Sequence, residues 1–308
     1  MAGRRQKTYP RIALSQLGAS DQAIREHYDV GNDFFKLWLD ETMTYSAAMW
    51  KDTPASLADA QKRKRAHLIW LARAAGRERV LDVGCGWGSC LDDLVVHFGV
   101  GHAVGLTLSS AQVEWIESRK VPRVEVRRES WEDHEATVPY DSIISIGAFE
   151  HFVRPEHTSD ERISVYREFF SKCHSMLRPG GWLAIQTQAY MRGAYCADSP
   201  LSAVFPESDM PRLPEIAAGF DCLFELESLT NDPQDYYKTL EAWDASFHEN
   251  QDRIIAVSSQ GLYEKFSRFL KGGLKGYASQ VFMLLRFSLR RVDSRYPGRS
   301  SGAGIGTV

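Results

Sequence analysis

The sequence feature that most constrains this chain is a run of glycines at every second position, directly after a short apolar segment. It reads Arg-Val-Leu-Asp-Val-Gly-Cys-Gly-Trp-Gly-Ser over residues 79–89. The apolar part predicts a strand buried on both faces. Gly84, Gly86 and Gly88 have no Cβ, so a ligand can approach the backbone closely. The apolar spacing of residues 91–98 then predicts a helix whose first N–H groups point at that ligand.

A glycine turn of this kind has two other interpretations. The simpler one is a tight strand-to-helix turn without a ligand. The other is the dinucleotide fingerprint, which needs Gly-x-Gly-x-x-Gly and an acidic residue roughly twenty positions later that binds a ribose. Here the spacing is Gly-x-Gly-x-Gly, and the uncharged residues 104–107 (Val-Gly-Leu-Thr) stand where the acid is expected. The sequence therefore disfavours a nicotinamide dehydrogenase.

Strand-like and helix-like segments alternate after this turn. Strands are expected at residues 102–107, 124–128, 141–146, 182–187, 220–229 and 277–289, and helices at 109–119, 166–177 (closed by 178–181) and 234–270. With the strand before the glycines, this predicts an α/β fold with a mainly parallel, seven-stranded sheet covered by helices on both faces. Ligands bind such sheets beyond the carboxyl ends of the strands. The glycine turn, Thr107, Trp131 and residues 147–151 should therefore converge on one rim.

Three segments outside this alternation have patterns of their own. Residues 21–40 predict two short helices, and residues 56–75 predict an amphipathic helix. The Lys-Arg-Lys-Arg run at residues 62–65 of the latter is interpreted as a solvated face rather than a site for acidic lipid or phosphate. Residues 188–218 lose any period and fill with Pro, Ser and Gly, so we expect an insertion over the site.

Composition excludes several classes of protein. A formal net charge of −3 and a pI near 6.3 give no electrostatic reason to expect nucleic acid. The five cysteines are an odd number without Cys-x-x-Cys spacing, so neither a disulfide framework nor a metal site is indicated. No apolar segment has the length of a signal peptide or a membrane span. We expect a cytoplasmic protein without a transmembrane segment.

Several motifs, taken together, identify a family. In chain order they are His27-Tyr28-Asp29, Asn32-Asp33-Phe34-Phe35, Thr44-Tyr45-Ser46, Leu81 to Gly88, Gly105 to Ser109 with Gln112, Trp131-Glu132, and Gly147 to Phe152. This combination resembles the cyclopropane fatty acid and mycolic acid cyclopropane synthases, which are S-adenosylmethionine-dependent methyltransferases. The resemblance covers roughly Ile24 to Tyr277. It implies a Rossmann-like class I methyltransferase fold.

The resemblance also implies roles for individual residues. The residues expected to contact the cofactor are Tyr45, Ser46, Gly84, Gly86, Thr107, Leu108, Gln112, Trp131 and Ile146. A sulfonium is a cation without hydrogen-bond donors, and an aromatic face and carboxylate or carbonyl oxygens suit it. The residues expected to be catalytic are Glu150, His151 and Tyr236. On sequence alone His151 serves equally well as a packing or capping residue, and Tyr236 as a core residue.

Four regions follow from the resemblance and the patterning. They are an N-terminal helical lid at 1–75, a cofactor-binding core at 76–187, an acceptor-binding insertion with the last helices and strands at 188–296, and a disordered tail at 297–308. The lid is expected because Tyr45 and Ser46 lie far upstream of the glycine turn yet match a cofactor-contacting motif. The candidate aromatic walls for the acceptor are Tyr28, Phe34, Phe35, Trp38 and the insertion.

Two departures from the family bear on the chemistry. Cyclopropane synthases have a Cys where this chain has Ala47, and a His in the fifth strand where it has Gln186. In the family, those side chains help to hold a bicarbonate that acts as base. Ala47 and Gln186 cannot replace them, so we expect no bound bicarbonate and assign proton removal to Glu150.

The resulting hypothesis is a methyltransferase that acts on a hydrophobic or unsaturated acceptor, lipid-like or a natural-product intermediate, by C-methylation. The first alternative is an N- or C-methyltransferase of a specialised small metabolite, because relatives of this fold with the same Phe-Glu-His motif methylate amines. The second is a non-catalytic protein that only binds the cofactor. The sequence leaves the acceptor open, and also whether the chain forms a homo-oligomer.

Overall fold

The computed structural model describes residues 18–20, 22, 30–51, 56–192 and 197–293. Its centre is one sheet in the order β3-β2-β1-β4-β5-β7-β6. β7 runs antiparallel to β5 and β6, and the other neighbours are parallel. The strands are β1 Arg79–Val83, β2 His102–Thr107, β3 Val124–Arg128, β4 Tyr140–Ile146, β5 Leu177–Tyr190, β6 Phe224–Asn231 and β7 Phe282–Arg291. The expected α/β class and mainly parallel, seven-stranded sheet are confirmed.

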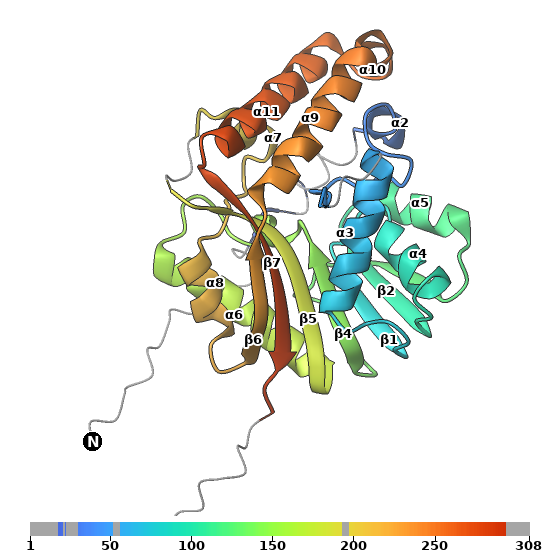
Figure 1. Cartoon of the computed structure of the whole chain (residues 1–308), viewed down its shortest axis with the longest axis vertical. Helices are drawn as coiled ribbons and strands as arrows, with labels where there is room; N and C mark the ends of the chain where they lie inside the picture. Colours follow the sequence, from blue (N-terminus) through green and yellow to red (C-terminus); the bar gives the residue numbers. More distant parts are fainter. Residues whose placement is uncertain (1–17, 21, 23–29, 52–55, 193–196, 294–308) are drawn as a thin grey trace, which may run out of the picture.

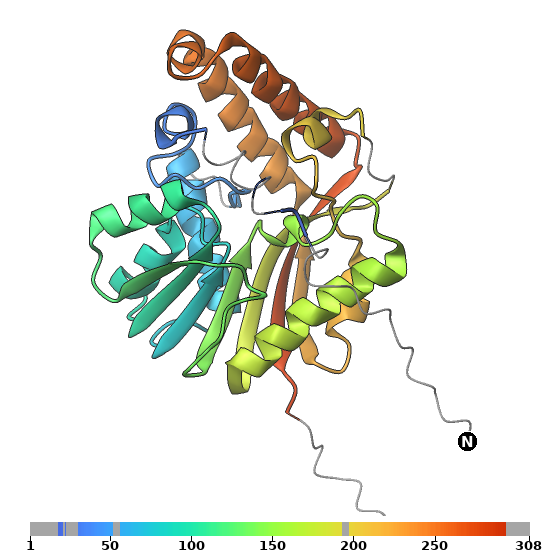
Figure 2. The same cartoon turned by 180° about the vertical axis from the view of Figure 1, so that it is seen from behind.

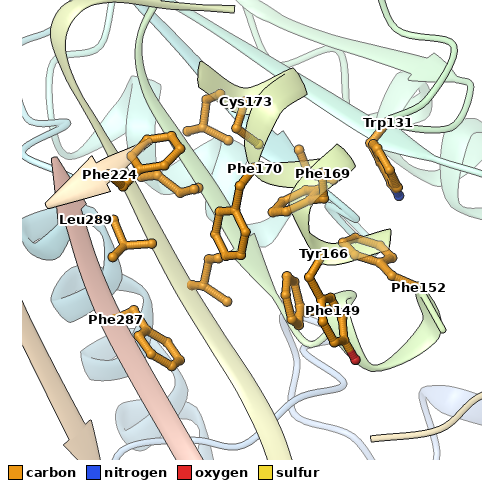
Figure 3. Close-up of a cluster of buried hydrophobic side chains, with 14 of the residues drawn as sticks. Trp131, Phe149, Phe152, Tyr166, Phe169, Phe170, Cys173, Phe224, Phe287 and Leu289 are labelled. Atoms are coloured by element: carbon orange, nitrogen blue, oxygen red, sulfur yellow. The ribbon is translucent and has the colours of Figure 1, made fainter. Parts of the chain in front are cut away.

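Helices cover both faces of the sheet (Figures 1 and 2). On one face lie α3 (Leu57–Leu71), α4 (Ser89–Val96) and α5 (Ser110–Arg119). On the other lie α6 (Ser159–Met176) and α8 (Leu213–Phe220). This opposite face is filled by aromatic side chains (Figure 3): Trp131, Phe149, Phe152, Tyr166, Phe169 and Phe170. Phe149 stacks on Tyr166 with 4.5 Å between ring centroids, which fixes the segment that carries Glu150.

A further helical layer stands beyond one end of the sheet (Figure 1). It contains α9 (Pro233–Glu249), α10 (Gln251–Val257) and α11 (Gln260–Ala278), with the short helices α2 (Asn32–Phe35) and α7 (Pro200–Val204) beside them. Edge-to-face ring contacts join this layer, for example between Trp38 and Trp243 at 5.8 Å and between Phe34 and Phe266 at 4.9 Å. None of the described helices is both long and apolar enough to cross a bilayer.

Several element boundaries differ from those expected. Residues 178–181 do not close a helix, because β5 already begins at Leu177, which pairs with Tyr140 of β4. α6 begins at Ser159, seven residues before the expected start, and a capping box of Thr158 and Glu161 satisfies its first N–H groups. Phe220 ends α8 instead of starting a strand.

Tyr277 was expected to begin the last strand, and this expectation is wrong. It lies in α11, and β7 starts only at Phe282. Its ring packs against Tyr236 and Phe282, at 5.0 and 5.4 Å between centroids. Aromatic residues suit a strand or a buried helix face equally well, so packing decided what the local pattern could not. Of the two short helices expected over residues 21–40, the second is present as α2, which is only four residues long, and most of the first falls at residues 23–29, outside the described residues.

Candidate active site

The glycine turn lies beyond the carboxyl end of β1, between β2 and the loop that follows β4. Gly84, Gly86 and Gly88 have φ values of +76°, +55° and +81°, a region that favours glycine. A Cβ added at Gly84 would lie 2.4 Å from the Cβ of Ala148. At Gly86 an added Cβ meets nothing within 4 Å, because this residue borders a cavity.

That cavity, of about 620 Å³, runs along the carboxyl edge of the sheet, and we call it the cofactor cavity. Seven of the nine residues expected to contact the cofactor line it: Tyr45, Gly84, Gly86, Thr107, Leu108, Gln112 and Trp131. The other two, Ser46 and Ile146, line a smaller adjoining cavity of about 50 Å³ that also touches Tyr45 and both glycines. The fold therefore gathers all nine around connected space.

The small adjoining cavity also holds charged residues that the sequence did not single out. Nζ of Lys64 donates a hydrogen bond to Oγ of Ser46 at 2.8 Å. Burial, then the charge of Arg65, lowers the pKa of Lys64 to about 7. Asp82, also in this wall, has its pKa raised to about 7 by burial, and its Oδ1 has no hydrogen-bond partner among the described residues. This carboxylate and ammonium match the charged groups of an amino acid such as the methionine part of the cofactor.

The expectation of a solvated face for residues 62–65 is wrong for two of its four side chains. Lys64 and Arg65 are 1% and 3% exposed, whereas Lys62 is exposed. Nε of Arg65 donates to Oδ2 of Asp93 at 2.6 Å. Lys64 and Arg65 face Ser46 and α4, where their hydrogen-bond partners lie. A run of four basic residues does not reveal which of them face this way.

At the far end of the cofactor cavity, Trp131 is held by Phe152 and Phe169, each 5.4 Å away between ring centroids. Thr107 Oγ1 donates to Oε1 of Gln112 at 2.5 Å, which fixes this amide against the cavity. Glu132 also lines this end, and burial, then the charge of Asp133, raises its pKa to about 7. Glu132 entered the sequence analysis only through the Trp-Glu pair.

A second cavity, of about 90 Å³, meets the cofactor cavity at Tyr45 and His151. We call it the acceptor cavity. Glu150, His151 and Tyr236 all line it, so the structure brings together the three residues expected to be catalytic. The rest of its wall comes mainly from residues 199–210 of the expected insertion and from α9 and α11. Phe34, Phe35 and Trp38 are not part of either cavity wall, because they are buried in the helical layer. Tyr28 is outside the described residues.

The carboxylate of Glu150 is buried, with only 7% of the residue exposed. Oε1 accepts a hydrogen bond from the backbone N–H of Gln188 at 2.8 Å, and Oε2 has no partner among the described residues. Burial raises the pKa of Glu150 to about 7. Burial also lowers the pKa of His151 to about 4, so this imidazole is neutral near pH 7, and its Nδ1 is hydrogen-bonded to Oγ of Ser208 at 2.7 Å.

The two departures from the family lie next to each other. Nε2 of Gln186 donates to the carbonyl oxygen of Ala47 at 3.0 Å, and Oε1 of Gln186 accepts from Nε of Arg286 at 2.8 Å. Arg286 is buried and also donates to the carbonyl of Ala48 and to Asp235, at 3.0 and 2.8 Å. Sequence reasoning missed Arg286, because only the antiparallel pairing of β7 with β5 places it opposite Gln186.

A seven-stranded sheet with an antiparallel β7 and a cavity on its glycine turn defines a class I S-adenosylmethionine-dependent methyltransferase. The family model of the mycolic acid cyclopropane synthetases matches residues 16–287. The chain belongs to that family, and its cofactor is S-adenosylmethionine.

Comparisons with individual proteins point to the same family. Cyclopropane mycolic acid synthase 2 of Mycobacterium bovis is 30% identical over 280 residues, which is 84% of this chain and 90% of the relative. Cyclopropane mycolic acid synthase 1 of Mycobacterium tuberculosis is 32% identical over 273 residues, 81% of this chain and 90% of the relative. The structure of the cyclopropane synthase MmaA2 from Mycobacterium tuberculosis aligns with a TM-score of 0.80 at 27% identity, and covers 89% of this chain and 99% of that one.

Proposed function

We propose that the protein transfers the methyl group of S-adenosylmethionine to a carbon atom of a hydrophobic or unsaturated, lipid-like acceptor, without bicarbonate. One observation carries this proposal. The acceptor cavity meets the cofactor cavity at Tyr45 and His151, and beside this junction it holds the buried carboxylate of Glu150 with Oε2 free. A structure of the mycolic acid cyclopropane synthase CmaA1, 28% identical to this chain, contains SAH together with CTAB, which supports a lipid-like acceptor.

The cofactor supplies a methyl group bound to a positively charged sulfur. We assign its binding to the nine residues gathered around the cofactor cavity and its small neighbour. Gly86 leaves the backbone open to it, and Tyr45, which lines all three cavities, offers an aromatic face at the junction where the methyl group must pass.

Glu150 is assigned as the base. The bound cofactor would supply the methyl group to the acceptor carbon and would leave as a neutral thioether, and Oε2 of Glu150 would take the proton that the acceptor must lose. A base works best with a pKa near the working pH, and burial brings the pKa of Glu150 to about 7. His151 and Tyr236 line the same cavity, and we assign them to positioning the acceptor.

The proposed division of the chain is a lid at 1–75, a cofactor-binding core at 76–187 and an acceptor-binding part at 188–296. Support for the lid comes from Gly18, Ala19, Ser20 and Tyr45, which line the cofactor cavity from upstream of β1. α3 packs on the sheet itself, so among the described residues of this range the covering role is assigned to residues 18–20 and Tyr45. Residues 199–210 support the acceptor-binding part, since many of them line the acceptor cavity.

Methyl-labelled S-adenosylmethionine, incubated with the protein and an extract of the cells that produce it, tests this function. We expect label in the apolar lipid fraction, in a product that carries a methyl branch by NMR. Label confined to polar amines would favour the alternative of a small-metabolite N-methyltransferase. Binding of S-adenosylhomocysteine without turnover in any fraction would favour the non-catalytic alternative.

A further inference from the structure

Residues 18–20 form a short strap along the wall of the cofactor cavity, and each of them is held by a hydrogen bond. The carbonyl oxygen of Gly18 accepts from Nε of Arg154 at 2.7 Å. The N–H of Ala19 donates to the carbonyl oxygen of His151 at 2.9 Å. Arg154 and His151 both belong to the segment that follows β4, so these two bonds fix the strap to the edge of the sheet.

The strap lies directly on the backbone of this segment. A Cβ added at Gly18 would lie 2.5 Å from the carbonyl oxygen of His151 and 3.1 Å from Cα of Phe152. Backbone atoms cannot move aside as the end of a flexible side chain can, so only glycine permits this close approach. The position of the strap is therefore specified by its first residue as well as by its hydrogen bonds.

The third bond of the strap comes from a carboxylate far away in the sequence. Oε2 of Glu207 accepts a hydrogen bond from the N–H of Ser20 at 2.7 Å. This bond holds the pKa of Glu207 below its usual value, so the carboxylate is ionised near pH 7 and the bond is charge-assisted. Nη2 of Arg154 lies 3.8 Å from the same oxygen, so the side chain that holds Gly18 also balances the charge of Glu207.

Glu207 belongs to the segment that walls the acceptor cavity, although it lines neither cavity itself. The next two residues, Ser208 and Asp209, line the acceptor cavity. Oγ of Ser208 is hydrogen-bonded to Nδ1 of His151 at 2.7 Å, and the N–H of Asp209 donates to the carbonyl oxygen of Val153 at 3.1 Å. These bonds seat the segment at the junction of the two cavities, from where the carboxylate of Glu207 reaches the strap.

We propose that Glu207 is a positioning residue that keeps the strap closed over the bound cofactor and thereby slows its release. Of the three partners of the strap, Glu207 is the one that does not line the cofactor cavity. Its side chain can therefore be changed without altering the surface that the cofactor touches. This inference deepens the proposed function and rests on it only in taking the cavity of about 620 Å³ as the cofactor site.

Stopped-flow measurement of the binding and release of S-adenosylhomocysteine by the full chain tests this role. In Glu207→Ala we expect release to be about tenfold faster, the effect of one hydrogen bond to a charged group. The association rate should not fall, and the number of binding sites per chain should not change, whereas a merely structural defect would reduce one or both. Glu207→Gln should lie between Glu207→Ala and the wild type, because its amide oxygen still accepts a hydrogen bond but carries no charge.

Glu156→Ala is the matched control, because Oε1 of Glu156 lies 3.9 Å from Nη1 of the same Arg154 and this carboxylate accepts no hydrogen bond from the strap. It should release S-adenosylhomocysteine at the wild-type rate. Gly18→Ala displaces the strap from the opposite side and should also speed release. Unchanged release in Glu207→Ala or in Gly18→Ala, or an equal acceleration in Glu156→Ala, would overturn the inference. A wild-type chain that does not bind S-adenosylhomocysteine would contradict the proposed function instead.

Discussion

The side-chain amide of Gln186 donates a hydrogen bond to the backbone carbonyl of Ala47 at 3.0 Å, so the two positions at which this chain departs from the cyclopropane synthases are bonded to each other. The other end of Gln186 is engaged by Arg286. The resemblance implies that the family has at these positions a Cys and a His that help to hold bicarbonate. In this chain, Gln186 of β5 instead connects Ala47 to Arg286 of β7. Its side-chain amide already has a hydrogen-bond partner at each end.

Added bicarbonate should therefore not stimulate the reaction. Gln186 is engaged by Ala47 and Arg286, and the methyl group of Ala47 cannot donate a hydrogen bond to an anion. The rate is measured in degassed buffer with and without bicarbonate, with a cyclopropane mycolic acid synthase as the control for dependence. Strong stimulation of this chain, or a cyclopropane as the main product, would contradict the assignment of Glu150 as the sole base.

Replacing Glu150 with Gln should lower the rate by roughly 10²–10⁴, while cofactor affinity changes less. The amide keeps the shape of the side chain but cannot take a proton. The wild-type rate should rise with pH through about 7, because burial raises the pKa of Glu150 to about 7 and only the ionised form is a base.

His151 cannot produce that inflection, because its pKa is lowered to about 4. Glu132 has a pKa raised to about 7 as well, so Glu132→Gln is the matched control and should keep the inflection. If the inflection disappears in Glu132→Gln and persists in Glu150→Gln, the titrating group is Glu132, and the assignment of Glu150 as the base is wrong.

Replacing Gly86 with Val should abolish binding of S-adenosylmethionine. The added side chain would fill open space at the cofactor cavity that we assign to the cofactor. In addition, valine is strained at the φ of +55° that this position has. Gly99→Val is the matched control, because Gly99 has φ of +66° and open space but does not line the cofactor cavity. Calorimetry should show binding lost only in the first variant, with circular dichroism retained in both. Wild-type affinity in Gly86→Val would show that the turn is not the site.

Replacing Lys64 with Met should weaken cofactor binding by about tenfold, the effect of one hydrogen bond to a charged group. Ser46 loses the donor that holds it at 2.8 Å, and Asp82 loses the cation that opposes the rise of its pKa. Lys62→Met removes the same kind of side chain from the exposed face and should have no effect. Equal affinities in the two variants would show that burial of Lys64 serves packing alone.

The sequence by itself determined the sheet, the glycine turn and the family. These follow from local order: a buried strand, glycines that alone accept positive φ, and short motifs in a set succession. The motifs predict nine residues that contact the cofactor and three that are catalytic, and the fold gathers all twelve around adjoining cavities. Their individual roles remain predictions that the variants above test.

Only the tertiary structure decided which polar residues turn inward. Lys64 and Lys62 are alike in the sequence, but Lys64 faces Ser46 and is buried, whereas Lys62 is exposed. Arg286 reaches Gln186 across 100 residues, and Arg162 reaches Asp209 across 47, because antiparallel pairing and the docking of loops bring them together. Such contacts depend on register and on the direction of each side chain, which the residues near them in sequence do not encode.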